Sequence, residues 1–213
     1  MKLRACTARA TALVVLMGLA AAPAAAADPV EMLREAVAAR LLLMDDVARF
    51  KWNAELPIAD PQREAALLQR MTASAVALGL PEDYARRVLA AQMEASRAIQ
   101  GALFDRWRAA RQGRFDEVPD LATVQRPAID RATTALLEAL AGARCELDDA
   151  EARRMFEAAP AGLDNQAVAW AIATAPLFTT SPCDIQVHSP EASRSTRASR
   201  SAAASPDTTT WMP

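Results

Sequence analysis

The 213-residue sequence contains very little histidine, lysine or strand-forming pattern. Its one histidine, His188, lies in a Ser/Ala-rich C-terminal stretch, which argues against a metal centre. Aromatic residues make up 5% of the chain and alternation of apolar and polar residues is rare, so a β-sheet is not expected. Good helix formers such as alanine, leucine, arginine and glutamate predominate. The sequence therefore predicts an all-α protein.

The first 27 residues have the three-part layout of a secretory signal peptide. A basic start, MKLRACTARA, precedes the apolar run TALVVLMGLAAA, and small residues lead up to Asp28. The apolar run is shorter than the ~20 residues that cross a bilayer. We predict cleavage after Ala27 and a periplasmic or secreted protein without membrane association. The alternative is an uncleaved membrane anchor.

The charge balance argues against nucleic-acid binding. The chain has 24 Lys+Arg and 26 Asp+Glu, a net charge of −2. Removing a leader that carries Lys2, Arg4 and Arg9 would change this net charge to −5. Nucleic-acid-binding proteins usually carry basic surfaces instead. Basic side chains with a function must therefore gather in a local pocket.

Residues 28–183 are expected to form one domain, a bundle of about six helices with three long ones at the N-terminus. Asp60 and Pro61 are typical of the first positions of a helix, and Gly79 is typical of its end. Apolar periodicity supports the other long helices. The helices are expected over about residues 30–55, 61–78, 81–113 and 126–144, with two shorter ones that start near residues 148 and 164.

The C-terminal region combines a cysteine pair with a low-complexity tail. Residues 184–213 are rich in Ser, Ala, Thr, Arg and Pro, which predicts disorder. Outside the leader the chain has two cysteines, Cys145 and Cys183, and an isolated pair in an oxidising compartment favours a disulfide. In the chain-entropy model such a cross-link stabilises by roughly 3–4 kcal/mol.

Two cations lie on one face of the first predicted helix. Arg40 and Lys51 are eleven residues apart, which is close to three helical turns, and Leu41, Met44 and Val47 make the same face partly apolar. Lys51 is also the only lysine outside the leader. A buried charge needs an anion. Pairing with nearby acidic residues or extension to solvent would satisfy this need without any function.

A stripe of uncharged polar residues follows the long third helix. Gln92, Ser96 and Gln100 recur at i, i+4 and i+8, where they could line a small-molecule site or face solvent. Arg63 and Arg126 add cations near the starts of two other helices. Helix N-termini favour anions, so the helix dipole does not explain these arginines.

Taken together, these positions resemble the all-helical chorismate mutase family. The order and spacing of Arg40, Lys51, Arg63, Ser96 and Gln100 are similar to those of the family. The stretch RLLLMDDVARFKW, followed by LPI and by Asp60 and Arg63, resembles its secreted subclass, as do the signal peptide and the cysteine pair. The resemblance covers about residues 30–183 and is sharpest between Arg40 and Gln100.

The resemblance implies an exported enzyme that rearranges chorismate to prephenate without metal or cofactor. The implied catalytic residues, Lys51 and Gln100, would act on the ether oxygen of the substrate. The implied substrate-binding residues are Arg40, Arg63, Arg126, Ser96, Glu64 and Asp60. Arg131 is the alternative to Arg126 if the preceding loop aligns differently. A homodimer is a further expectation from the family.

Two other interpretations remain open at this point. A non-catalytic exported helical effector or binding protein would pair the same cations with its own carboxylates. The related isochorismate–pyruvate lyase shares the fold, although the signal peptide and the cysteine pair favour the mutase.

Overall fold

The computed structural model describes residues 27–179 and residue 183, and every regular element within these residues is helical. The all-α prediction is therefore confirmed. The predicted tail and all but the last residue of the predicted signal peptide lie outside the described residues. The helices are α1 (Pro29–Leu42), α2 (Met44–Asn53), α3 (Pro61–Ala77), α4 (Glu82–Ala109), α5 (Arg126–Ala143), α6 (Ala150–Met155) and α7 (Ala167–Thr174).

The prediction of one uninterrupted first helix is wrong at Leu43. This residue separates α1 from α2 and has φ −63° and ψ −18°, which are right-handed angles closer to a 3₁₀ turn than to an α-helix. The local tightening breaks the regular i→i−4 bonding without changing the handedness of the chain. Arg40 is therefore carried by α1 and Lys51 by α2. The other five predicted helices correspond to α3 to α7.

Helix α3 begins and ends as its sequence predicts. The side chain of Asp60 accepts a hydrogen bond from the Arg63 backbone N–H at 3.3 Å, and Pro61 occupies the first turn. Gly79 follows the helix with φ +81°, a left-handed conformation that glycine adopts without steric cost. The turn allows the chain to reverse directly into α4.

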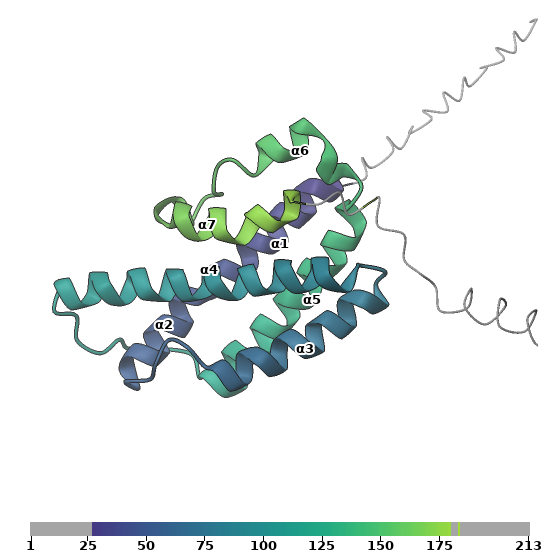
Figure 1. Cartoon of the computed structure of the whole chain (residues 1–213). Coiled ribbons are helices and arrows are strands. Elements are labelled where there is room, and N and C mark those ends of the chain that lie inside the picture. The colour runs from purple at the N-terminus through teal and green to yellow at the C-terminus, as the bar shows by residue number, and fades with distance from the viewer. Residues whose placement is uncertain (1–26, 180–182, 184–213) are drawn as a thin grey trace, which may run out of the picture.

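Helix α4 is the central element of the fold. Its 28 residues span about 42 Å, and it contacts α2, α3 and α7. In Figure 1 it crosses the molecule with α6 and α7 on one side and α2 and α3 on the other. The buried residues Tyr84, Val88 and Leu89 belong to its apolar face. No helix in the described part of the chain is long and apolar enough to span a membrane.

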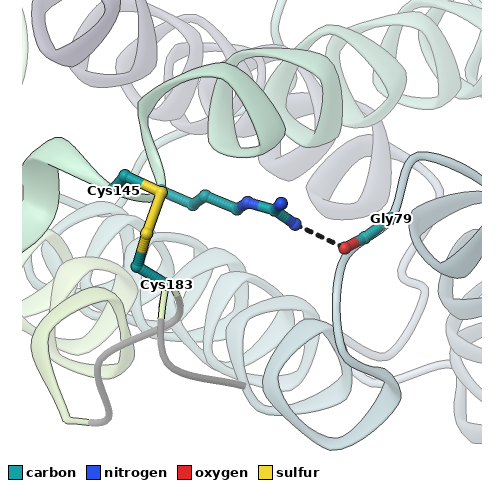
Figure 2. The surroundings of a disulfide bond; sticks show 4 residues. Gly79, Cys145 and Cys183 are labelled. Atoms are coloured by element: carbon teal, nitrogen blue, oxygen red, sulfur yellow. Dashed lines mark hydrogen bonds between the residues drawn. A yellow bond between two sulfur atoms is a disulfide. The ribbon is translucent and has the colours of Figure 1, made fainter. Parts of the chain in front are cut away.

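A disulfide joins the end of α5 to the chain beyond α7. Cys145 and Cys183 form this bond with their Cα atoms 5.0 Å apart, as the sequence predicts (Figure 2). The neighbouring Arg144 donates a hydrogen bond to the backbone oxygen of Gly79. The α3–α4 turn, the end of α5 and the last described residue are thus tied together at one place.

Candidate active site

All eight residues predicted for the site line one pocket. The pocket lies among α1, α2, α3, α4 and the start of α5, so residues far apart in sequence meet there. The eight predicted residues are Arg40, Lys51, Asp60, Arg63, Glu64, Ser96, Gln100 and Arg126. The other lining residues are Met44, Val47, Ile58, Leu67, Met93, Arg97, Leu121 and Ile129. The spacing of the eight residues therefore reflects a real convergence, although their individual roles remain predictions.

A wider groove lies next to this pocket. It has a volume of about 740 Å³, and it is lined partly by Trp52, Phe104 and Arg114, whereas the pocket itself has about 90 Å³. Lys51 and Ile58 line both spaces. The smaller pocket is the candidate site because charged and amide side chains from five helices converge there.

Arg40 is the most deeply buried charge in the described part of the chain, with an exposed fraction of 3%. Its guanidinium donates to Thr133 Oγ1 at 3.2 Å, to the Gln92 backbone oxygen at 3.0 Å and to Ser96 Oγ at 2.9 Å. All three acceptors are neutral, and no carboxylate of the described residues lies within ion-pair distance of Arg40. Burial lowers the pKa of Arg40 to about 10, so the group remains charged at neutral pH.

The polar stripe of α4 divides between the core and the pocket. Ser96 and Gln100 line the pocket. Gln92 instead donates from its side chain to the Ala173 backbone oxygen of α7 at 3.2 Å. Gln100 Nε2 donates to the Ser96 backbone oxygen at 3.0 Å and contacts Met44 Sδ at 3.8 Å, while its buried Oε1 has no partner. A thioether is a weak acceptor, so one N–H of Gln100 is available to a better one.

Lys51 lies at the boundary between the pocket and the wider groove. Its ammonium donates to the Ile58 backbone oxygen in the loop between α2 and α3. Burial lowers the pKa of Lys51 from its ordinary value, an effect to which Arg126 contributes, whereas the charges of Asp60 and Glu64 oppose it. An ammonium has three donors, so this one can bind a further acceptor.

Asp60 and Glu64 bind the start of α3 and two arginines of the pocket. Glu64 Oε1 accepts from the Asp60 backbone N–H at 3.3 Å, and Glu64 Oε2 forms an ion pair with Arg97 of α4. Asp60 Oδ2 forms an ion pair with Arg126 at 3.4 Å. Each carboxylate therefore accepts a backbone hydrogen bond at the start of α3 and also forms an ion pair with an arginine of the pocket.

The start of α5 brings Arg126 into the pocket and leaves Arg131 outside it. A short π-helical turn, Leu121–Gln125, precedes α5, and the Asp120 side chain accepts from the backbone of Ala122 and Thr123 at its start. Arg131, the alternative considered from sequence, is exposed and does not line the pocket. Of the two residues, Arg126 is the one that the fold makes available to a ligand.

Two contributors to the site escaped the sequence analysis. Thr133 of α5 is fully buried and contacts Arg40, and Arg97 of α4 pairs with Glu64. Arg97 directly follows Ser96, so its position in the polar stretch of α4 was a usable signal. Nothing in the sequence near Thr133 distinguishes it from other threonines on a helix.

The lining of the pocket carries an excess of positive charge. Five cationic side chains face two carboxylates there, although the whole chain has a net charge of −2. Among the described residues no group of three or more His, Cys, Asp and Glu side chains could hold a metal ion. Fold and site together define a class of protein, an all-α protein with a small cationic pocket that suits a compact anion with more than one negative charge.

Comparisons with known proteins identify the family of this chain. The family described as "Chorismate mutase type II" matches residues 31–101. The secreted chorismate mutase of Mycobacterium tuberculosis is 36% identical over 118 residues, which cover 54% of this chain and 59% of that protein. The match thus spans less than two thirds of the length of that relative.

Solved structures extend the similarity over the helical domain. The chorismate mutase of Burkholderia thailandensis is similar with a TM-score of 0.63 and 35% identity, covering 70% of this chain and 98% of that one. The secreted chorismate mutase of Yersinia pestis has a TM-score of 0.55 at 21% identity, covering 68% of this chain and 94% of that one, and supports the fold alone. The chain belongs to the chorismate mutase type II family.

Proposed function

We propose that the protein is an exported chorismate mutase that rearranges chorismate to prephenate. The observation that carries the proposal is Arg40, a buried cation with no carboxylate partner among the described residues, in a pocket where cations outnumber carboxylates. Leaving a charge buried without a counter-ion is costly, and a substrate carboxylate would provide one. Chorismate carries two carboxylates.

The rearrangement needs orientation and electrostatic stabilisation from the protein. One ether C–O bond breaks as a C–C bond forms within the same molecule, and no proton has to be transferred. The pocket would hold the flexible substrate in a compact conformation, with Arg40 and Arg126 binding its carboxylates. Arg63 would add positive potential, and Ser96 would donate to a carboxylate by turning its hydroxyl away from the Gln92 backbone oxygen, to which it now donates at 2.7 Å.

Lys51 and Gln100 would stabilise the negative charge that grows on the ether oxygen. Lys51 would do so with an ammonium donor that Ile58 does not use, and Gln100 with the N–H that now contacts Met44 Sδ. Glu64 would accept from the ring hydroxyl, and Asp60 would hold the neighbouring backbone. The site would act through charges and hydrogen bonds.

Substrate binding would replace contacts that now fill the pocket. A volume of about 90 Å³ is below the roughly 300 Å³ at the lower end of typical ligand pockets. The Lys51–Ile58 and Arg126–Asp60 contacts are partly exposed and can exchange for substrate carboxylates. The wider groove beside Lys51 offers the approach.

Export is part of the proposal. Two observations support it, the signal-peptide pattern at the N-terminus and the Cys145–Cys183 disulfide, which favours an oxidising compartment. The relative from Mycobacterium tuberculosis is named a secreted chorismate mutase. The compartment, periplasmic or extracellular, and the homodimer stay predictions.

The test is a chorismate assay on residues 28–213, following the loss of the ultraviolet absorbance of chorismate. Lys51→Ala is expected to lower kcat by at least about a hundredfold, because it removes a donor to the ether oxygen. Arg49→Ala is the matched control, since Arg49 lies on the same helix in a partly exposed pair with Asp45. Unimpaired turnover in Lys51→Ala would contradict the mechanism.

Product analysis separates the remaining alternatives. A mutase yields prephenate from chorismate, whereas an isochorismate–pyruvate lyase would release pyruvate from isochorismate. A non-catalytic binding protein would turn over neither substrate.

A further inference from the structure

Arg97 has no role in the mechanism described above, yet it lines the pocket. It lies on α4 immediately after Ser96, and its guanidinium reaches across to Glu64 on α3. We propose that Arg97 is a positioning residue, which holds the Glu64 carboxylate in place and keeps it away from the cations that bind the substrate. This inference rests on the proposed function.

The contacts of Glu64 fix the position of its carboxylate from two sides. Oε2 is bound by Arg97, and Oε1 accepts the Asp60 backbone N–H at 3.3 Å. The first contact joins α3 to α4, and the second joins Glu64 to the first turn of its own helix. A carboxylate bound through both oxygens has one preferred orientation, which the proposed contact with the ring hydroxyl requires.

Without Arg97, the negative charge of Glu64 would interact with Lys51, which the substrate needs. Glu64 is already close enough to Lys51 to influence its ionisation. A carboxylate released from Arg97 would turn toward the Lys51 ammonium, which its charge already influences and whose contact is with the neutral backbone oxygen of Ile58. The substrate would then have to displace an internal anion before Lys51 could bind it, which weakens substrate binding.

This ion pair differs from the surface pairs of the same helix. Arg97 and Glu64 have exposed side-chain fractions of 37% and 27%, whereas Arg86 and Glu82 have 50% and 63%. Both pairs are exposed enough that their contribution to stability is small. Of these two pairs, only Arg97–Glu64 borders the pocket, so a loss of function in a folded Arg97 variant would be a local effect in the pocket and not a loss of stability.

The test compares Arg97→Gln, Arg97→Lys and the control Arg86→Gln in the chorismate assay. Arg97→Gln is expected to raise KM about tenfold while kcat changes less than about threefold, because ground-state and transition-state binding weaken together. Arg97→Lys keeps the cation and should stay within about threefold of the original KM. Arg86→Gln removes the same charge from the same helix and should leave KM and kcat unchanged.

A double-mutant cycle with Glu64→Gln isolates the positioning role. In the Glu64→Gln background, Arg97→Gln should cause no further increase in KM, because no carboxylate is left to hold. Arg97→Met is a second neutral substitution if Arg97→Gln does not fold, as judged by circular dichroism.

Two results would overturn the inference in an active enzyme, namely an unchanged KM in both neutral variants or an equal effect of Arg97→Gln with and without Glu64. If the unsubstituted protein does not convert chorismate, the proposed function itself fails and the inference fails with it. The two failures are therefore distinguishable.

Discussion

At the scale of single residues, Arg40 depends on three neutral neighbours that belong to two other helices. Thr133, Gln92 and Ser96 supply its acceptors, and they come from α4 and α5 while Arg40 itself lies on α1. A guanidinium has five N–H donors, so these three contacts fix the side chain and leave two donors for a ligand. The site thus combines a rigid cation with the more exposed Lys51 and Arg126.

The pH dependence of the proposed activity follows from Lys51 and Gln100. Gln100 donates from an amide, so turnover should not fall between about pH 5 and 8. Burial lowers the pKa of Lys51, so its charge is lost at a lower pH than that of an exposed lysine, and activity should decline on the alkaline side below pH 10.5. Initial rates over the whole range measure both effects; a steep decline between pH 5 and 8 would contradict the assignment of Gln100.

Replacing Gln100 by glutamate should move the optimum toward acid. Only the protonated form of a carboxylic acid can donate to the ether oxygen, and an ordinary glutamate has a pKa of about 4.3. Gln100→Glu should therefore lose activity as pH rises above that pKa, while the original protein stays flat. A flat profile for Gln100→Glu would show that residue 100 makes no such donation.

Much of the site was predicted from the order and spacing of polar residues that resemble those of the chorismate mutase family. Gln100 follows Ser96 by four residues on α4, so the two share one side of that helix. Arg40 and Lys51 lie on consecutive helices and still line the same pocket. The partners that cross between helices were not predictable in this way. The Arg97–Glu64 and Thr133–Arg40 contacts depend on how α3, α4 and α5 pack, and no local pattern encodes that packing.

At the scale of helices, local sequence signals predicted where α3 begins and ends, but they did not predict the break between α1 and α2 at Leu43. Asp60, Pro61 and Gly79 each act through their own backbone or side chain, so the bounds of α3 could be read directly from sequence. Leu43 has no such signature, since leucine is a good helix former. Its 3₁₀-like angles lie where α1 passes into α2, and no residue type at this point marks the interruption.

Two glycines should respond in opposite ways to alanine. Gly79 has φ +81°, so Gly79→Ala should lower the free energy of unfolding by about 1 kcal/mol. Gly142 lies in α5 and an added Cβ would meet no atom within 4 Å, so Gly142→Ala should raise the free energy of unfolding by roughly 0.5–1 kcal/mol. Urea denaturation measures both. Equal effects of the two substitutions would contradict the conformational argument.

At the scale of the whole molecule, the pocket and the disulfide lie at opposite ends of α5. Arg126 begins that helix and lines the pocket, and Cys145 follows its end. The cross-link is therefore expected to support the stability of the fold and to leave the geometry of the pocket unchanged. The all-α class followed from composition, but the order in which these helices surround the pocket did not.

Removing the disulfide should separate stability from activity. The double substitution Cys145→Ser and Cys183→Ser is expected to lower the free energy of unfolding by roughly 3–4 kcal/mol in the chain-entropy model. Activity at 25 °C should stay close to that of the original protein while the fold persists. Urea denaturation and the chorismate assay test the two parts, and a parallel loss of turnover in the folded variant would contradict the separation.

The same bond makes a covalent ring of the chain from Cys145 to Cys183, and both α6 and α7 belong to that ring. A single protease cut in the stretch after Glu157, which connects these helices, would leave two polypeptides held together through sulfur. The nicked protein should run as one band without a reducing agent and as two bands with it. Helix α7 would remain attached beside α4 even though its peptide connection to α6 is gone.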